Sequence, residues 1–190
     1  MESISVVRDA FGRVHELVPA VLNGLSRDDL RWRPDPSANP IGWLVWHLLR
    51  VEDDHLAPLA GFDQVWFQGW QERFDLPYAA DAGGFGQSPE EVGQFDVPGA
   101  ELLLGYAKAV AVQTEQVLDA LARDDLDRVV PSEQPPGVIV DTRWNPPVTL
   151  GVRLVSVVLD TAQHIGQAAY VKGLRERLVG HDSGWQGYPE

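Results

Sequence analysis

A chain of 190 residues with 44% hydrophobic residues and seven tryptophans is long and apolar enough to bury the core of one globular domain, so we expect a single domain over residues 1–190. It contains no cysteine, which excludes disulfides, thiolate zinc sites and cysteine nucleophiles and leaves only nitrogen and oxygen ligands for a metal. The net charge is −13, with eleven acids and one base between residues 52 and 101, and such a surface repels nucleic-acid phosphates.

The chain shows no secretory leader and no apolar run of about 18 residues. We therefore expect a cytoplasmic protein that binds neither nucleic acid nor membrane. The partner that remains is a small-molecule substrate.

The first segment with helical periodicity runs from Ser3 to Asn23. Its apolar side chains recur at steps of mostly three and four residues, and the following Asn-Gly pair is typical of a helix end. Ser26 begins one further short turn. His15 lies beside the apolar stripe, where a histidine is more often a packed side chain than a metal ligand.

Two further helices are separated by long connections. The second helix is predicted to begin at Asn39-Pro40, with asparagine as the cap, and to end at Pro58. Residues 62–97 form an acidic, aromatic-rich connection, which indicates a lid, a pocket wall or a surface crossover pinned by its aromatic residues. The third helix is predicted over Gly99–Ala122, and residues 123–148 form the second long connection.

The second helix carries several polar residues on or beside its apolar stripe. On a helical wheel Glu52 and His55 fall inside the stripe and His47 flanks it, so the pattern alone ranks His55 above His47 as the inward group. A buried Glu52 needs a partner, because an unpaired buried carboxylate is costly. Arg153 of the last helix is one candidate for that partner.

The last helix begins at Leu150, after Thr149 as its cap, and has no proline through Leu174. Its first half is apolar over most of its surface, which predicts a place in the middle of a bundle. Asp160 and His164 are four residues apart and therefore lie one above the other, with Cβ atoms about 5–6 Å apart. Both residue types bind Zn²⁺ and other divalent metals, although the same spacing also suits a buried ion pair or an Asp-oriented histidine.

These elements predict an all-α fold, a four-helix bundle with two long connecting loops. Bundles of this kind bury metal and cofactor sites between facing helices. A third ligand to join Asp160 and His164 must come from the second helix, as His47 or His55, and a three-ligand site with open positions suits a catalytic metal.

Two segments resemble the DinB-like superfamily: NPIGWLVWHLLRVEDDHL (39–56) and LDTAQHIGQAAYVKGLRERL…SGWQG (159–187). The anchors are G-W-L-x-x-H-L, x-H-x-G-[QH] and the late G-W, and the resemblance covers nearly the whole chain. Within the superfamily the chain is most similar to the actinobacterial branch that includes mycothiol-dependent enzymes and the N-terminal domain of mycothiol-dependent maleylpyruvate isomerase. The resemblance implies a four-helix bundle of DinB-like type with a divalent metal, zinc or nickel, held by three histidines.

Carried over to this sequence, the resemblance assigns His47 and His164 as metal ligands. In the family the last helix supplies two histidines, and Asp160 occupies the position of the first. Related members also have a carboxylate at this position. The resemblance also overrules the ranking of His55 above His47 by the wheel. Further candidates around the metal or for the substrate are Glu52, His55, Arg153 and Gln167.

The resemblance implies a metal-dependent enzyme in which a low-molecular-weight thiol such as mycothiol is deprotonated and attacks an electrophilic substrate, giving S-transfer or isomerisation. Arg153 or a residue of the 62–97 connection is expected to orient the substrate. The alternative is a non-catalytic binding or dimerisation module with a degenerate site, favoured by the replacement at Asp160. A metal-activated-water hydrolase, which needs no thiol, is a third hypothesis. Aromatic residues at the surface leave a homodimer open.

Overall fold

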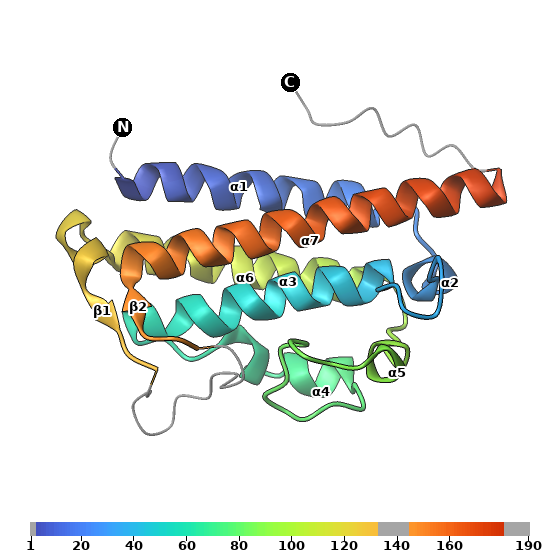
Figure 1. Cartoon of the computed structure of the whole chain (residues 1–190), viewed down its shortest axis with the longest axis horizontal. Helices are drawn as coiled ribbons and strands as arrows, with labels where there is room; N and C mark the ends of the chain where they lie inside the picture. The colour runs from blue at the N-terminus through green and yellow to red at the C-terminus, as the bar shows by residue number, and fades with distance from the viewer. Residues whose placement is uncertain (1–2, 133–144, 181–190) are drawn as a thin grey trace.

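The computed structural model describes residues 3–132 and 145–180. In this part of the chain four long helices lie side by side and form the bundle (Figure 1). The predicted all-α four-helix bundle is confirmed. The long helices are α1 (Ser3–Leu22), α3 (Ile41–Leu56), α6 (Ala100–Ala120) and α7 (Leu150–Val179).

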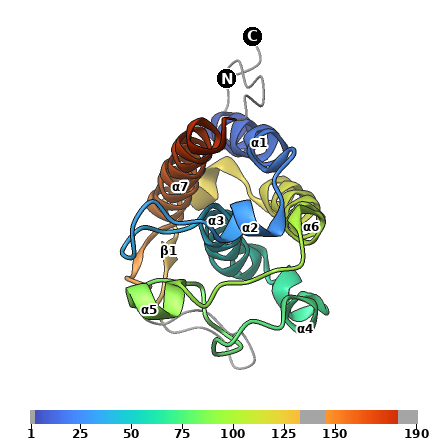
Figure 2. The same ribbon diagram turned by 90° about the vertical axis from the view of Figure 1, so that its right-hand side faces the viewer.

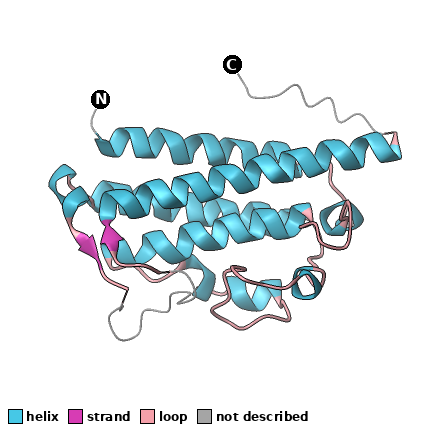
Figure 3. Ribbon diagram, viewed as in Figure 1, coloured by secondary structure: helices cyan, strands magenta, loops and turns pink. Residues whose placement is uncertain are grey.

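Short elements connect the long helices (Figure 3). They are α2 (Arg27–Arg31), α4 (Trp70–Phe74), α5 (Pro89–Val92) and the 3₁₀ turns Ala57–Ala60, Val65–Phe67 and Arg123–Asp127. A two-residue antiparallel ribbon, which the sequence did not indicate, pairs β1 (Val129–Val130) with β2 (Val148–Thr149) directly before α7. None of the described helices is long and apolar enough to cross a membrane.

Local hydrogen bonds explain most helix ends. Ser26 forms a capping box with Asp29 at the start of α2, and the Thr149 side chain accepts a hydrogen bond from the Val152 N–H at the start of α7. The predicted cap of α3 was wrong by one residue. Pro40, with extended backbone and no side-chain hydrogen bond, is the cap, and the helix begins at Ile41.

The most deeply buried helix is α3, although the sequence favoured the last helix for that place. Every residue of α3 except Val51 is buried, whereas Val152, Val155 and Leu159 of α7 are exposed. Figure 2 shows the reason: the three other long helices surround one side of α3, and the segment carrying α4 and α5 covers the other. The apolar stripe in the sequence therefore could not identify the inward-facing residues of α3, because nearly the whole surface of this helix is covered.

The 62–97 connection is pinned to the bundle through Asp53 of α3. Its carboxylate accepts hydrogen bonds from the backbone N–H groups of Val65 and Trp66, each at 2.8 Å, and from the Tyr106 hydroxyl at 2.8 Å. The Trp66 ring then packs against Tyr106 and Phe74. Burial raises the pKa of Asp53 against the opposing effect of the nearby guanidinium and these donors. A polar anchor and an aromatic cluster together fix the connection against α3 and α6.

Candidate metal centre

The packing of α3 against α7 brings His47, Asp160 and His164 together. Each residue offers one ligand atom, and the three atoms lie within 4.8 Å of one another. The imidazoles of His47 and His164 meet edge to face with centroids 4.7 Å apart, and His164 Nε2 lies 3.6 Å from Asp160 Oδ2. Bonds of about 2.0–2.2 Å to a shared metal ion would require these three atoms to move slightly closer together, and rotation of the side chains can bring them there.

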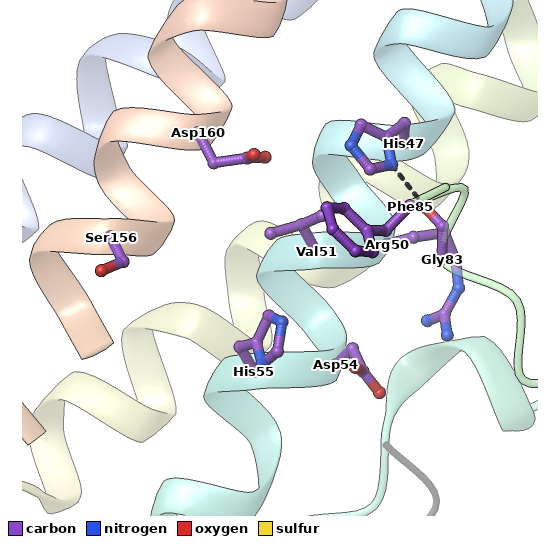
Figure 4. Close-up of a pocket in the computed structure, with 9 residues that line it drawn as sticks. All are labelled: His47, Arg50, Val51, Asp54, His55, Gly83, Phe85, Ser156 and Asp160. Carbon is purple, nitrogen blue, oxygen red and sulfur yellow. Dashed lines mark hydrogen bonds between the residues drawn. The ribbon is translucent and has the colours of Figure 1, made fainter. Parts of the chain in front are cut away.

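Backbone and aromatic contacts hold the ring of His47. Its Nδ1 lies 2.5 Å from the Gly83 carbonyl, which can only accept, so Nδ1 carries the hydrogen and Nε2 carries the lone pair (Figure 4). The ring also stacks on Trp43 at 4.7 Å with an interplanar angle of 15°. An oxygen acceptor on the outer nitrogen is the usual way in which a metal-binding histidine is oriented.

His164 is oriented in the same way from its own helix. Its Nδ1 lies 2.9 Å from Gln167 Oε1, one turn further along α7, and its Nε2 is directed at Asp160. Burial lowers the pKa of His164, but the hydrogen bond and charge of Asp160, together with Gln167, outweigh burial and leave the pKa above its usual value. A metal ion must therefore compete with a proton at this nitrogen.

Asp160 supplies the test of whether the residues fit a cation. Its Oδ1 is buried and has no hydrogen-bond partner among the described residues, although an unsatisfied buried carboxylate oxygen is costly. Two imidazole nitrogens and one carboxylate oxygen form a donor set that suits Zn²⁺, Ni²⁺ and related divalent ions. The three residues thus fit a divalent cation.

A pocket of about 200 Å³ opens beside this cluster, between α3, α7 and the segment 83–85 (Figure 4). Its surface is mostly apolar. The residues that line it are His47, Arg50, Val51, Asp54, His55, Gly83, Phe85, Ser156 and Asp160. A small molecule in this pocket would contact two of the three cluster residues.

The expected pairing of Glu52 with Arg153 was wrong. Glu52 lies in the core of the bundle, where its Oε1 contacts His15 Nε2 at 2.7 Å and accepts a hydrogen bond from the Thr114 hydroxyl at 2.5 Å. Glu52 bonds side chains of α1 and α6, whereas Arg153 of α7 bonds His55, three residues further along α3. Neither Glu52 nor His15 is part of the pocket surface.

Arg153 and His55 form a separate pair at the edge of the pocket. Arg153 donates to His55 Nδ1 at 2.9 Å and to the Pro146 carbonyl at 2.7 Å. His55 lines the pocket and Arg153 does not, so Arg153 lies behind that surface, where it bonds His55 and is near the charge of Asp54. His55 is buried like His47 (7% and 5% exposed), but the metal cluster contains only His47. The wheel ranking of the two histidines was wrong because α3 is covered on all sides.

The pocket residues that the sequence did not single out come from the 62–97 connection, from α3 and, as Ser156, from α7. Gly83 and Phe85 belong to the run Gly83-Gly84-Phe85-Gly86, and a cluster of three glycines around one aromatic residue was the available signal. Arg50 is fully buried and bonds the Ala82 carbonyl and Gln64, so its role could be read only from the folded chain.

The sequence and the fold were compared with known proteins. No curated protein matches the chain. A solved structure does: the crystal structure of a conserved protein from Enterococcus faecalis is 29% identical, with a TM-score of 0.78, over 95% of this chain and 99% of that one. The family model of the DinB superfamily matches residues 10–168. With this match over most of its length and a four-helix bundle that carries a possible His-Asp-His metal site, the chain belongs to the DinB superfamily.

Proposed function

We propose that the protein is a divalent-metal-dependent enzyme that acts on a small molecule, with His47, Asp160 and His164 as the metal ligands. One observation carries the proposal: three potential ligand atoms lie within 4.8 Å of one another at the wall of a pocket, and a buried oxygen of Asp160 has no partner among the described residues. A purely structural ion pair would not require an adjoining pocket.

The residues of this chain hold and shield the site. Gly83 and Gln167 fix the two imidazoles with Nε2 turned inward, and Trp43 covers one face of His47. A bound cation would supply a Lewis acid that polarises a carbonyl or lowers the pKa of a coordinated thiol or water. The apolar pocket would keep bulk water from the substrate, which strengthens electrostatic interactions inside it.

The finer proposal is transfer to, or isomerisation through, an external thiol of the mycothiol type. The chain has no cysteine, so a sulfur nucleophile must come from a second small molecule. A hydrolase that uses metal-activated water is the competing chemistry. Turnover of an electrophilic substrate with and without added thiol separates the two, since only the transferase or isomerase requires the thiol.

Metal binding is tested on protein purified without chelators, by elemental analysis and by thermal unfolding with Zn²⁺, Ni²⁺ and Mn²⁺. A cation that binds only the folded state at one hundred times its Kd adds about 2.7 kcal/mol to the free energy of unfolding. The wild type and the His55→Ala variant should retain the metal and the stabilisation, whereas His47→Ala should lose both. Less than about a tenth of an equivalent of metal in the wild type, with no stabilisation by any of the three ions, would refute the proposal.

A non-catalytic module is the second candidate, favoured by one observation. Asp160 is a carboxylate in a ligand position and its side chain is 36% exposed, which is more open than the side chain of His164 at 19%. If metal binds neither the wild type nor the Asp160→His variant, the module is the better description.

A further inference from the structure

The pocket is bounded on one side by a phenyl ring held in a tight turn. Phe85 occupies the first corner of the turn 84–87, which the Gln87 N–H closes by donating to the Gly84 carbonyl at 3.2 Å. Glycines with positive φ flank it, Gly84 at +98° and Gly86 at +73°. Phe85 is 47% exposed, whereas His47, Arg50 and His55 of the same pocket lining are buried. Its ring therefore lies at the mouth of the pocket with one part against the interior and one part in solvent.

The turn that carries Phe85 packs against His47 of the candidate metal centre and against Trp43. A Cβ on Gly84 would lie 2.7 Å from His47 Nδ1 and 2.9 Å from the Trp43 ring. The turn is therefore in close contact with both side chains and leaves no room for a methyl group. The Trp43 Nε1–H also donates to Gln87 Oε1 at 2.8 Å, which ties the other end of the turn to α3. The position of the Phe85 ring thus follows from the same contacts that orient His47.

The pocket lining has an apolar part and a charged part. Arg50 lies 3.5 Å from Asp53, and Figure 4 shows its guanidinium beyond Gly83, away from Asp160. The Arg153 guanidinium can only donate, so His55 Nδ1 is an acceptor and the imidazole is neutral. Phe85 and Val51 supply the apolar surface, and the Asp160 carboxylate, whose Oδ1 has no hydrogen-bond partner among the described residues, supplies a negative charge.

We infer that Phe85 is a specificity-determining residue and that the pocket accepts a small molecule with an apolar group about the size of a benzene ring. The apolar group packs between Phe85 and Val51, and this placement puts the rest of the molecule beside His47 and Asp160. A cavity of about 150 Å³ suffices for benzene, and this one is of similar size. The inference rests on the proposed function, because it names the substrate class of the same site.

The experiment follows the backbone amide signals of residues 83–86 by NMR while two matched probes are added: benzyl alcohol and benzoate. The protein is the full chain, once treated with chelator and once loaded with Zn²⁺. Benzyl alcohol should bind saturably in both states. In the chelator-treated protein benzoate should bind on the order of tenfold more weakly, because its carboxylate would lie beside the Asp160 carboxylate.

Variants assign the effect to the side chain. Phe85→Ala should weaken benzyl alcohol binding on the order of tenfold, and Phe85→Leu should retain most of it, since an apolar wall of similar size remains. Phe62→Ala is the matched control, because Phe62 is also partly exposed (37%) but does not line the pocket. Its binding should equal that of the wild type.

The inference is overturned if benzyl alcohol fails to bind, if benzoate binds the chelator-treated protein as tightly, or if Phe85→Ala binds like Phe62→Ala. Binding in the chelator-treated protein does not depend on the metal. Failure of the pocket inference and failure of metal binding are therefore separate results.

Discussion

Replacing Gly84 with alanine would place a methyl group against the candidate metal centre. The new Cβ would meet His47 Nδ1 at 2.7 Å, the Trp43 ring at 2.9 Å and the Trp46 ring at 3.1 Å, all closer than normal van der Waals contact. The φ of +98° adds backbone strain of about 1–3 kcal/mol for a residue with a side chain. Since the three rings are packed in the core, the turn must move away and the hydrogen bond from His47 to Gly83 must lengthen or break.

The magnitude follows from these two parts. Strain and displaced packing together should lower the free energy of unfolding by about 3 kcal/mol, and in a domain of this size the melting temperature should fall by about 6–12 °C. Loss of the carbonyl that orients a ligating histidine typically costs about 10- to 100-fold in metal affinity. Both quantities are measured on one sample, by thermal unfolding in chelator and by chelator competition for Zn²⁺.

Gly86→Ala is the control for backbone strain. Gly86 also has a positive φ, +73°, but a Cβ there would meet nothing within 4 Å. This variant should pay only the strain and should bind Zn²⁺ like the wild type. Equal Zn²⁺ affinity of the Gly84 and Gly86 variants would refute the reasoning that the turn orients His47.

Three further predictions concern the metal cluster, the core and the loop anchor. His164→Ala should reduce Zn²⁺ affinity by more than about 100-fold, because it removes a ligand. Gln167→Ala should reduce it by about 10- to 100-fold, because it removes only the acceptor that orients His164. Equal losses of affinity in chelator competition would contradict these roles. Burial lowers the pKa of His15, but the hydrogen bond and charge of Glu52 outweigh burial and leave the pKa raised in the folded protein. The stability that His15 contributes is therefore fully present below the pKa of an unfolded histidine, about 6.5, and is lost as the pH rises through the folded pKa. In urea unfolding the advantage of the wild type over His15→Gln should therefore be larger at about pH 5.5 than at about pH 8.5, and a pH-independent difference would count against the pairing with Glu52. Asp53→Asn should lower the free energy of unfolding by about 1–3 kcal/mol, because it removes one of the carboxylates near the buried Arg50 guanidinium and weakens the anchor of the 62–97 connection. Limited proteolysis should then cut that connection faster, and wild-type resistance would refute the anchor.

Local signals in the sequence were sufficient for the four long helices. Apolar side chains at steps of three and four residues, together with side chains that cap a helix within three residues, act over one or two turns and can be read from neighbouring positions. Ser26 and Thr149 are such caps, and the structure has both. The spacing of Asp160 and His164 likewise determines that the two side chains share one face of α7, whatever lies opposite them.

Contacts between distant parts of the chain were not accessible in this way. Glu52 found its partner His15 on another helix, 37 positions away, and the acceptor that orients His47 is a backbone carbonyl 36 positions away that has no side-chain signature. The pairing of buried polar groups depends on how each helix is oriented about its axis and on which segment covers it. Sequence periodicity describes only the exposed and buried sides of one element.

The sequence by itself therefore determined the class of fold, the approximate ends of the long helices and the pair Asp160 and His164, because each depends on interactions within a few turns. Periodicity could not choose between His47 and His55, and the family resemblance had favoured His47. Only the tertiary structure showed that α3 is the buried helix, that His47 lies against that pair, and that Phe85 borders the pocket. The physical reason is that the 62–97 connection covers the side of α3 that the long helices leave open, and a covering segment changes the environment of residues far from it in sequence.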